Sequence, residues 1–323
     1  MQGENFVMQG TERTPSIFEG MLLLFTAFIG RYLIGYIMLP INWGISYFVF
    51  DVSESFSTGF TQTAYFLVFI VFPISLTRSL HPDLNRYMRV KTLSDGMTGL
   101  SVLAGLLLAA VCVVIGALWE NALLTWGAVQ TASGSVMPDS IAGVLWVILY
   151  SAVLPGICEE LLFRGALLSA WEEKGSLCAM LVTGVCFMCI HGNVWGAPVE
   201  LLAGLVLAFL VIAADSLFAG MLCHMIYNTA VTVLQYCVQQ GAIGAEMSIY
   251  TALFILLGGL VLLGVTLYIV YRRGIQPFGV ARPPRAAAKR QIGGTELCVT
   301  LCSAISFVCV YALELLELLG VKY

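Results

Sequence analysis

Charged side chains are scarce in this sequence. Asp, Glu, Lys and Arg make up 11% of the 323 residues, whereas soluble domains carry roughly 25%. Hydrophobic residues make up 59%, and the mean hydropathy is +0.93. The alternating apolar and polar pattern of a membrane β-barrel is absent. The composition therefore predicts an all-α membrane protein, because helices satisfy their own backbone polar groups in lipid.

Concentrated positive charge and paired cysteines are also missing. The formal net charge is −4, and no basic stripe is interleaved with aromatic residues, so we expect no nucleic-acid partner. The ten cysteines fall almost wholly in apolar stretches and form no CxxC pair. We expect them to be small buried side chains and not a disulfide framework. No feature of the sequence predicts an oligomeric state.

Apolar runs predict a polytopic bundle of about eight or nine spans, since a membrane helix needs roughly 20 apolar residues. The expected domains are an N-terminal segment at 1–20, a membrane helical domain at 21–271, a basic loop at 272–295 and an additional C-terminal helix at 296–323. The candidate spans lie near 21–49, 59–77, 97–118, 141–170, 176–194, 198–214, 216–238, 249–271 and 296–320.

Three of the predicted loops, 50–58, 119–140 and 239–248, contain no Lys or Arg. Basic residues gather instead in the alternate loops: Arg78, Arg86, Arg89, Lys91, Lys174, Arg272, Arg273, Arg282, Arg285, Lys289 and Arg290. Cytoplasmic loops of membrane proteins carry such an excess of Lys and Arg. We therefore expect a multi-pass protein of the cell membrane, embedded in the lipid bilayer, with its N-terminus and basic loops in the cytoplasm.

Few ionisable residues fall at membrane depth, and each is a functional candidate because a charge in lipid is unfavourable. Glu314 and Glu317 lie near the outer end of the last span, where we expect an interfacial position without a catalytic role. The third histidine, His81, lies in a basic loop and is expected to be solvated. The remaining candidates are Arg31, Glu159, Glu160, Arg164, His191, Glu200 and His224.

The two adjacent glutamates of the fourth span are predicted to differ. Glu160 and Arg164 are four residues apart, so they share a helix face and can pair. Glu159 lies about 100° around the helix and is free to face a cavity. Pro155 removes the helical hydrogen bond to the Ser151 carbonyl. A Glu–Arg clasp between helices is the structural alternative for the charged pair.

The other polar groups fall at a similar depth. Glu159, His191, His224 and Asn228 lie about 12–24 Å from the inner ends of their helices at 1.5 Å per residue. A carboxylate and an imidazole together can take a proton from water, while a second imidazole and an amide can donate to an oxyanion. This set supports amide hydrolysis without a covalent intermediate. Packed, hydrogen-bonded pairs between helices are the structural alternative.

A metal site is the main chemical alternative. Glu159, Glu160, His191 and His224 are residue types that bind zinc. The sequence has no HExxH, the helical signature that places two histidine ligands on one face. We therefore expect no metal and no cofactor, with zinc as the minor alternative.

Three motifs carry a resemblance to a known family. They are EExxxR (Glu159, Glu160, Arg164), FxxxH (Phe187, His191) and HxxxN (His224, Asn228). In this order they resemble the motifs of the CPBP family, the CAAX-protease and bacteriocin-processing group, which includes the type II CAAX prenyl endopeptidases. The resemblance covers about residues 140–240, the expected catalytic core, and implies a CAAX-protease-like helical core.

The resemblance also implies roles. Glu159 and His191 would activate the attacking water, and His224 and Asn228 would stabilise the oxyanion. Glu160 and Arg164 would orient the site or the substrate. The family is regarded as glutamate-dependent without an obligate metal, and its sites open to the cytosol.

An intramembrane glutamic endopeptidase acting on a membrane-associated peptide or protein is therefore the favoured interpretation. A prenylated CAAX protein, a bacteriocin leader and a signalling pro-peptide all fit as substrates. The alternative is a non-catalytic immunity or chaperone-like membrane protein of the same fold. A proton-relay transporter predicts paired broken helices in two related halves, and the sequence shows no internal repeat.

Overall fold

The computed structural model describes residues 16–48, 53–80, 87–129, 137–244, 247–274 and 294–318. Most of the predicted N-terminal segment and of the basic loop, with Arg282, Arg285, Lys289 and Arg290, lies outside these ranges, as does His81. Within the described ranges the regular structure is helical, without strands. The predicted all-α class is confirmed.

Eight helical segments in this part of the chain are long and apolar enough to cross a membrane, which confirms a polytopic bundle. Two of them are built from shorter helices that run on without a break, α2 with α3 and α6 with α7 and α8. The elements are α1 (Ile17–Phe48), α2 (Glu54–Tyr65), α3 (Phe72–Leu80), α5 (Asp95–Thr125), α6 (Ile141–Ile148), α7 (Leu154–Glu160), α8 (Leu168–Trp171), α10 (Ala197–Ala214), α11 (Leu217–Gln239), α12 (Ile249–Arg273) and α13 (Gly294–Leu318).

The predicted fifth span is shorter than expected. Helix α9 covers Ser176–His191, only 16 residues, or about 24 Å at 1.5 Å per residue. This is less than the roughly 30 Å of a bilayer's hydrocarbon core. Gly192 ends the helix in the left-handed conformation with φ 55°, which glycine adopts readily because it has no Cβ. His191 is therefore the last residue of a helix that stops short.

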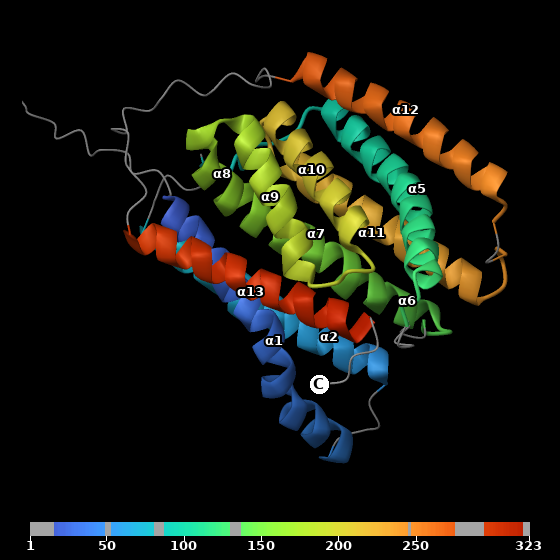
Figure 1. Cartoon of the computed structure of the whole chain (residues 1–323), viewed down its shortest axis with the longest axis horizontal. Coiled ribbons are helices and arrows are strands. Elements are labelled where there is room, and N and C mark those ends of the chain that lie inside the picture. The colour runs from blue at the N-terminus through green and yellow to red at the C-terminus, as the bar shows by residue number, and fades with distance from the viewer. Residues whose placement is uncertain are drawn as a thin grey trace, which may run out of the picture.

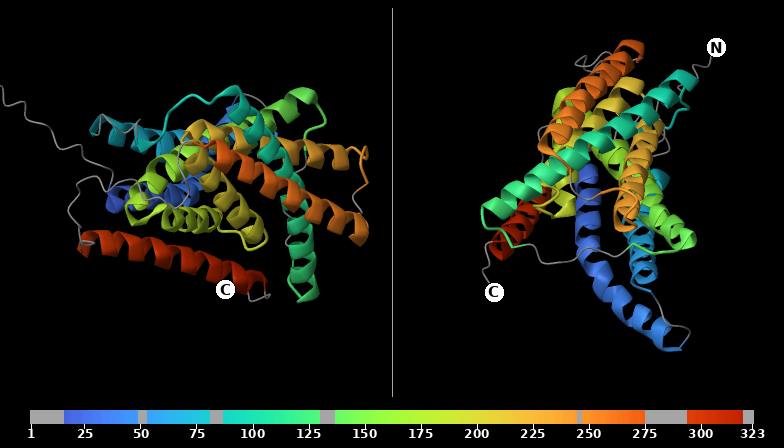
Figure 2. Two further views of the ribbon diagram at one scale, coloured as in Figure 1. Left: turned by 90° about the horizontal axis from the view of Figure 1, so that it is seen from above. Right: turned by 90° about the vertical axis from the view of Figure 1, so that its right-hand side faces the viewer.

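The helices pack around a central group. Figure 1 shows α7, α9, α10 and α11 in the middle of the molecule, with α5 and α12 along one side and α1 and α13 along the other. The packing contacts agree, because α9 lies against α10, α11 against α5, α12 against α5, and α13 against α1. The further views in Figure 2 show α13 and α12 at the outside of the bundle.

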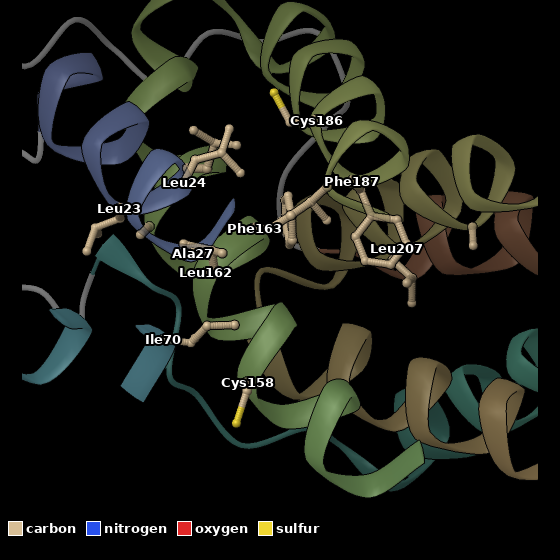
Figure 3. Close-up of a cluster of buried hydrophobic side chains, with 14 of the residues drawn as sticks. Leu23, Leu24, Ala27, Ile70, Cys158, Leu162, Phe163, Cys186, Phe187 and Leu207 are labelled. Carbon is tan, nitrogen blue, oxygen red and sulfur yellow. The ribbon is translucent and has the colours of Figure 1, made fainter. Parts of the chain in front are cut away.

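Apolar side chains from several helices meet where these groups join (Figure 3). Three of these side chains are 0% exposed, namely Leu24 of α1, Leu207 of α10 and Phe163. Phe163 packs edge-to-face on Phe187 of α9, with ring centroids 5.1 Å apart. Phe187 in turn lies 5.7 Å from the ring of His224 on α11. The hydrophobic core therefore reaches directly to one of the predicted site residues.

The helix from Ile141 to Lys174 is continuous, but its hydrogen-bond pattern changes on both sides of α7. π-helical turns occupy Leu149–Val153 and Leu161–Leu167, and such turns occur frequently at functional sites. Pro155 lies in the first turn of α7 and has no backbone N–H to give to the Ser151 carbonyl. That carbonyl instead accepts a hydrogen bond from the side chain of Asn228, with Nδ2 and O 3.0 Å apart.

Candidate active site

A cavity of about 360 Å³ opens between α1, α2, α7, α9, α10 and α11. Its lining is more polar than that of two larger cavities in the described part of the chain, of about 550 and 640 Å³. The lining residues are Arg31, Gln62, Phe66, Tyr150, Ser151, Pro155, Glu159, Phe187, His191, Gly196, Val199, Glu200, Ala203, His224, Tyr227 and Asn228. All four residues predicted as catalytic, Glu159, His191, His224 and Asn228, are among them.

Glu159 comes to the cavity from the last turn of α7. Its side chain is buried, with 9% of the residue exposed. Its Oε2 atom is buried and accepts no hydrogen bond from the described residues. A buried carboxylate oxygen without a protein donor is unfavourable unless water or a ligand satisfies it. The carboxylate of Glu159 is therefore available to bind a water molecule in the cavity.

His191 enters the same cavity from the end of α9. Its Nδ1 lies 2.7 Å from the carbonyl oxygen of Phe187, one turn back along the helix. Because a carbonyl can only accept, Nδ1 carries the hydrogen and donates it. In the neutral ring Nε2 is then the nitrogen with the free lone pair. The helix backbone thus selects the tautomer whose Nε2 can take a proton.

His224 is held by the second glutamate. Its Nδ1 lies 3.0 Å from Oε1 of Glu160, and the same oxygen accepts a hydrogen bond from Arg164 at 2.6 Å. Glu160 and Arg164 are both 0% exposed. Arg164 also donates to the carbonyl of Gly204 at 2.9 Å and stacks over Phe187 at 4.6 Å from the ring centroid. The predicted pairing of Glu160 with Arg164 is present, and it extends to His224.

Asn228 lies one turn beyond His224 on α11. One hydrogen of its Nδ2 is donated to the carbonyl of Ser151, four residues before Pro155. The amide group has two donor hydrogens, so a second remains. Asn228 is thereby fixed in orientation while it keeps a donor for the cavity.

The structure thus sorts the six predicted site residues into two layers. Glu159, His191, His224 and Asn228 line the cavity, whereas Glu160 and Arg164 do not and reach it only through His224 and Phe187. Glu159 and His191 share the cavity without a hydrogen bond between their side chains. The adjacent glutamates differ as their spacing predicts.

Some lining residues were not assigned to the site by sequence reasoning. Arg31 and Glu200 were recognised as ionisable residues at membrane depth, yet no motif joined them to the others. Arg31 is the one Lys or Arg in the cavity wall, and Glu200 has a buried Oε2 without a partner among the described residues. Tyr150, Tyr227 and Gln62 carry no sequence signal, because polar aromatic and amide residues are common at helix surfaces.

A larger cavity of about 640 Å³ lies on the other side of α7. Ile157 and Leu161 line this larger cavity, whereas Pro155 and Glu159 line the smaller one. The described residues of its wall are almost wholly apolar, and Arg78 is the one charged residue among them. No described residue of this wall has a carboxylate or an imidazole. The reactive site is therefore identified by the chemistry of its lining and not by the size of the cavity.

The zinc alternative can be compared with the geometry. In the described parts of the chain, no group of three or more His, Cys, Asp or Glu side chains is placed so that it could hold a metal ion. Both imidazoles also use Nδ1 for other partners, Phe187 and Glu160. That activity requires no metal stays a prediction.

Comparison with known proteins gives one match. Residues 141–230 match the family described as type II CAAX prenyl endopeptidase Rce1-like. The match covers less than a third of the chain and includes the segments that carry all six predicted site residues. No curated protein and no solved structure matches the chain. Residues 141–230 are therefore similar to the CAAX-type intramembrane protease domain of the Rce1-like family, and the described part of the chain has the long apolar helices of a multi-pass membrane protein.

Proposed function

We propose that this protein is an intramembrane glutamic endopeptidase that hydrolyses a peptide bond in a membrane-associated peptide or protein. The observation that carries the proposal is the convergence of Glu159, His191, His224 and Asn228 on one cavity from three helices. The match of residues 141–230 to a protease family supports it independently.

Activation of water is assigned to Glu159 and His191. Glu159 has a carboxylate oxygen without a protein donor, and His191 is held in the tautomer that leaves Nε2 unprotonated. Water bound between them loses a proton to one of these bases as its oxygen attacks the carbonyl carbon. The same proton is later given to the amine nitrogen when the C–N bond breaks. General acid–base catalysis of this kind contributes about 10²–10⁴-fold.

Stabilisation of the oxyanion is assigned to His224 and Asn228. Asn228 keeps one Nδ2 hydrogen after its bond to Ser151. For Nε2 of His224 to donate, the ring carries a proton on both nitrogens. Its positive charge then faces the Glu160 carboxylate that holds Nδ1. A single donor to an oxyanion is worth about 10²–10³-fold in turnover.

The substrate is proposed to enter from the membrane. The domain lies among helices long enough to span a bilayer, so a substrate with a lipid or hydrophobic segment can be held at the depth of the cavity. Because the matching family is described as a CAAX prenyl endopeptidase, a prenylated CAAX protein is the first substrate class to test. No metal and no cofactor are included in the proposed reaction.

The test is peptide cleavage by the purified full-length chain reconstituted in liposomes, with a prenylated CAAX peptide labelled at both ends. We expect Glu159→Gln and His191→Ala each to reduce turnover by at least about 100-fold. Glu54→Gln is the matched control, because Glu54 is exposed at the start of α2, away from the cavity. A chelator is expected to leave the rate unchanged.

Two results would contradict the proposal. Unchanged cleavage in either Glu159→Gln or His191→Ala would rule out the assigned mechanism. A biological effect of the chain that survives both substitutions, with normal folding, would instead favour the non-catalytic immunity or chaperone-like alternative.

A further inference from the structure

Helix α13 lies outside the matched protease domain, yet it packs directly on the helices that frame the site. It runs along α1 (Figure 1). Phe307 of α13 meets Phe28 of α1 edge-to-face, with ring centroids 4.7 Å apart. Phe307 is 7% exposed, whereas Val308 beside it is 68% exposed. The helix therefore presents one face to the bundle and the other to its surroundings.

The inward face of α13 carries polar groups that packing alone does not require. Tyr311 follows Phe307 by four residues, and Glu314 follows Tyr311 by three, so the three residues share a face. Both polar side chains form hydrogen bonds with backbone atoms of another part of the chain, at the end of α9.

Tyr311 completes the last turn of α9. Its hydroxyl donates to the carbonyl oxygen of Met188 at 2.9 Å. The last four carbonyls of a helix have no intrahelical donor, and the N–H of Gly192 goes to Cys189 instead. Tyr311 thus gives a partner to a carbonyl that lies three residues before His191.

Glu314 holds the loop that follows. Its Oε2 accepts a hydrogen bond from the backbone N–H of Val194 at 2.5 Å. The carbonyl of Val194 accepts from Nε1 of Trp119 on α5 at 2.9 Å. The loop is therefore held by hydrogen bonds to two helices, α13 and α5.

The same loop has no free space at its first residue. A Cβ at Gly192 would lie 2.6 Å from the Tyr32 hydroxyl of α1 and 3.0 Å from Cγ1 of Val310 of α13. Contacts closer than about 3.4 Å leave little freedom to shift in a close-packed interior. The path of the chain after His191 is thus fixed by contacts with α1 and α13.

This loop joins two parts of the cavity wall. His191 precedes it, and Gly196 and Glu200 follow it, and all three line the cavity. A movement of the α9 end displaces the imidazole relative to Glu159, which is carried by a different helix. The position of His191 relative to Glu159, the two bases assigned to water activation, therefore depends on contacts made outside the matched domain.

We propose that Tyr311 and Glu314 are positioning residues that fix His191 relative to Glu159. This inference rests on the proposed peptidase function, but the placement of His191 can be measured separately from activity. It gives a role to the C-terminal helix, which the sequence left without one, and to Glu314, for which we expected no catalytic part.

The first test measures kcat and KM of cleavage for Tyr311→Phe, Glu314→Ala and Glu314→Gln. Loss of one hydrogen bond of about 1 kcal/mol corresponds to about fivefold, so we expect Tyr311→Phe and Glu314→Ala to lower kcat by about that factor with KM unchanged. Glu314→Gln keeps a side-chain carbonyl that can accept from Val194 and is expected to stay within about twofold of wild type. Tyr250→Phe and Leu315→Ala are matched controls, because both side chains are exposed.

The kinetic results discriminate clearly. An unchanged kcat in both Tyr311→Phe and Glu314→Ala, or a change confined to KM, overturns the inference. An equal loss in Glu314→Gln and Glu314→Ala also overturns it, since the charge and not the hydrogen bond would then be responsible. Tyr311→Phe removes a single oxygen, so it serves as the test if Glu314→Ala does not fold.

The second test does not depend on activity. The rate at which diethyl pyrocarbonate modifies His191 is measured by mass spectrometry in the full-length chain, with His81 as the internal reference. Release of the α9 end is expected to raise the rate at His191 about threefold or more in Tyr311→Phe and Glu314→Ala. An unchanged rate overturns the positioning role. A raised rate in a chain that cleaves no peptide contradicts the proposed function alone.

Discussion

Adjacent residues in one helix can have opposite environments, and Glu159 and Glu160 are such a pair. Glu159 faces the cavity and has an oxygen without a protein donor. Glu160 is 0% exposed and its Oε1 binds both Arg164 and His224, whereas its Oε2, like that of Glu159, has no hydrogen-bond partner among the described residues. The charge of Glu160 is compensated by the fold, whereas that of Glu159 is left for water or a substrate. Stability is therefore expected to depend on one glutamate and chemistry on the other.

Glu160→Gln is predicted to destabilise the protein more than Glu159→Gln does. It leaves the buried guanidinium of Arg164 without its carboxylate, and removal of one partner of a buried ion pair costs about 3–5 kcal/mol. Glu159→Gln removes no ion pair with a described residue, so we expect its stability to match wild type. Thermal unfolding of both variants in detergent measures the difference. Equal melting temperatures would show that Glu160 is not the structural member of the pair.

At the scale of a helix, a hydrogen bond beside a proline connects the fourth span to the seventh. Pro155 cannot bond to Ser151, and the Ser151 carbonyl accepts from Asn228 instead. The proline cannot supply the α-helical bond to Ser151, and the Ser151 carbonyl orients a cavity residue on α11. The π-helical turn before α7 shifts the neighbouring bonds, with the N–H of Leu154 going to Leu149.

Pro155→Ala is predicted to lower kcat by about fivefold without unfolding the protein. An added N–H competes for the Ser151 carbonyl, and one hydrogen bond that orients Asn228 is worth about 1 kcal/mol. The matched control is Pro73→Ala, which lies within α3 and outside the cavity lining. Steady-state kinetics on both variants give the comparison. A larger effect from Pro73→Ala would disconnect the proline from the site.

The α9–α10 hairpin depends on two glycines at its crossing. A Cβ on Gly204 would lie 2.9 Å from both Cα and the carbonyl oxygen of Gly184. Such a contact is with backbone, so one helix has to move away from the other. The carbonyl of Gly204 also accepts from Arg164, and the close approach therefore supports the buried charge network.

Gly204→Ala is predicted to destabilise the protein by about 1–3 kcal/mol, the usual penalty for overpacking, and to lower activity because α9 carries His191. Gly258→Ala in α12 has open space at its Cβ and is expected to be neutral or slightly stabilising, by up to about 1 kcal/mol. The melting temperatures of the two variants test this. A neutral Gly204→Ala would mean that the helices are not held at this distance.

At the scale of the whole molecule, two of the basic residues that predict the topology join segments that are far apart in sequence. Arg89 and Lys91 form ion pairs with Asp215, and Arg89 also pairs with Glu172. These contacts tie the segment before α5 to the turn between α10 and α11 and to the end of α8. The charges that the sequence used to predict topology therefore also hold one end of the bundle together.

The cytoplasmic orientation of that end is a prediction. An epitope inserted after Gly241, between α11 and α12, is expected to react with antibody in intact cells. The same epitope within residues 275–293, between α12 and α13, is expected to react only after permeabilisation. The reverse pattern would invert the topology and place the basic loops outside, against the usual excess of Lys and Arg in the cytoplasm. The short hairpin of α9 and α10 leaves the expectation unchanged, since the two helices enter and leave together.

Much of this protein can be predicted from its sequence, because the governing signals are local. Long apolar runs predict membrane helices by length alone, and eight helices in the described part of the chain are long and apolar enough to span a membrane. A polar residue in such a run is conspicuous for the same reason, and so Glu159, Glu160, His191 and His224 could be selected without a structure. Helical spacing was enough to pair Glu160 with Arg164. The fifth helix is shorter than predicted because Gly192 ends it, whereas the third, predicted at 97–118, extends over Asp95–Thr125.

The contacts that complete the site were decided by tertiary structure. His224 and Glu160 are 64 residues apart in sequence, Asn228 and Ser151 are 77 apart, and Tyr311 and Met188 are 123 apart. No periodicity or spacing links such positions, because each helix satisfies its own backbone and leaves its neighbours open. The association of helices in lipid is driven by close packing and by interhelical hydrogen bonds. The sequence determined which polar groups enter the membrane, and only the packing of the helices determined which of them meet.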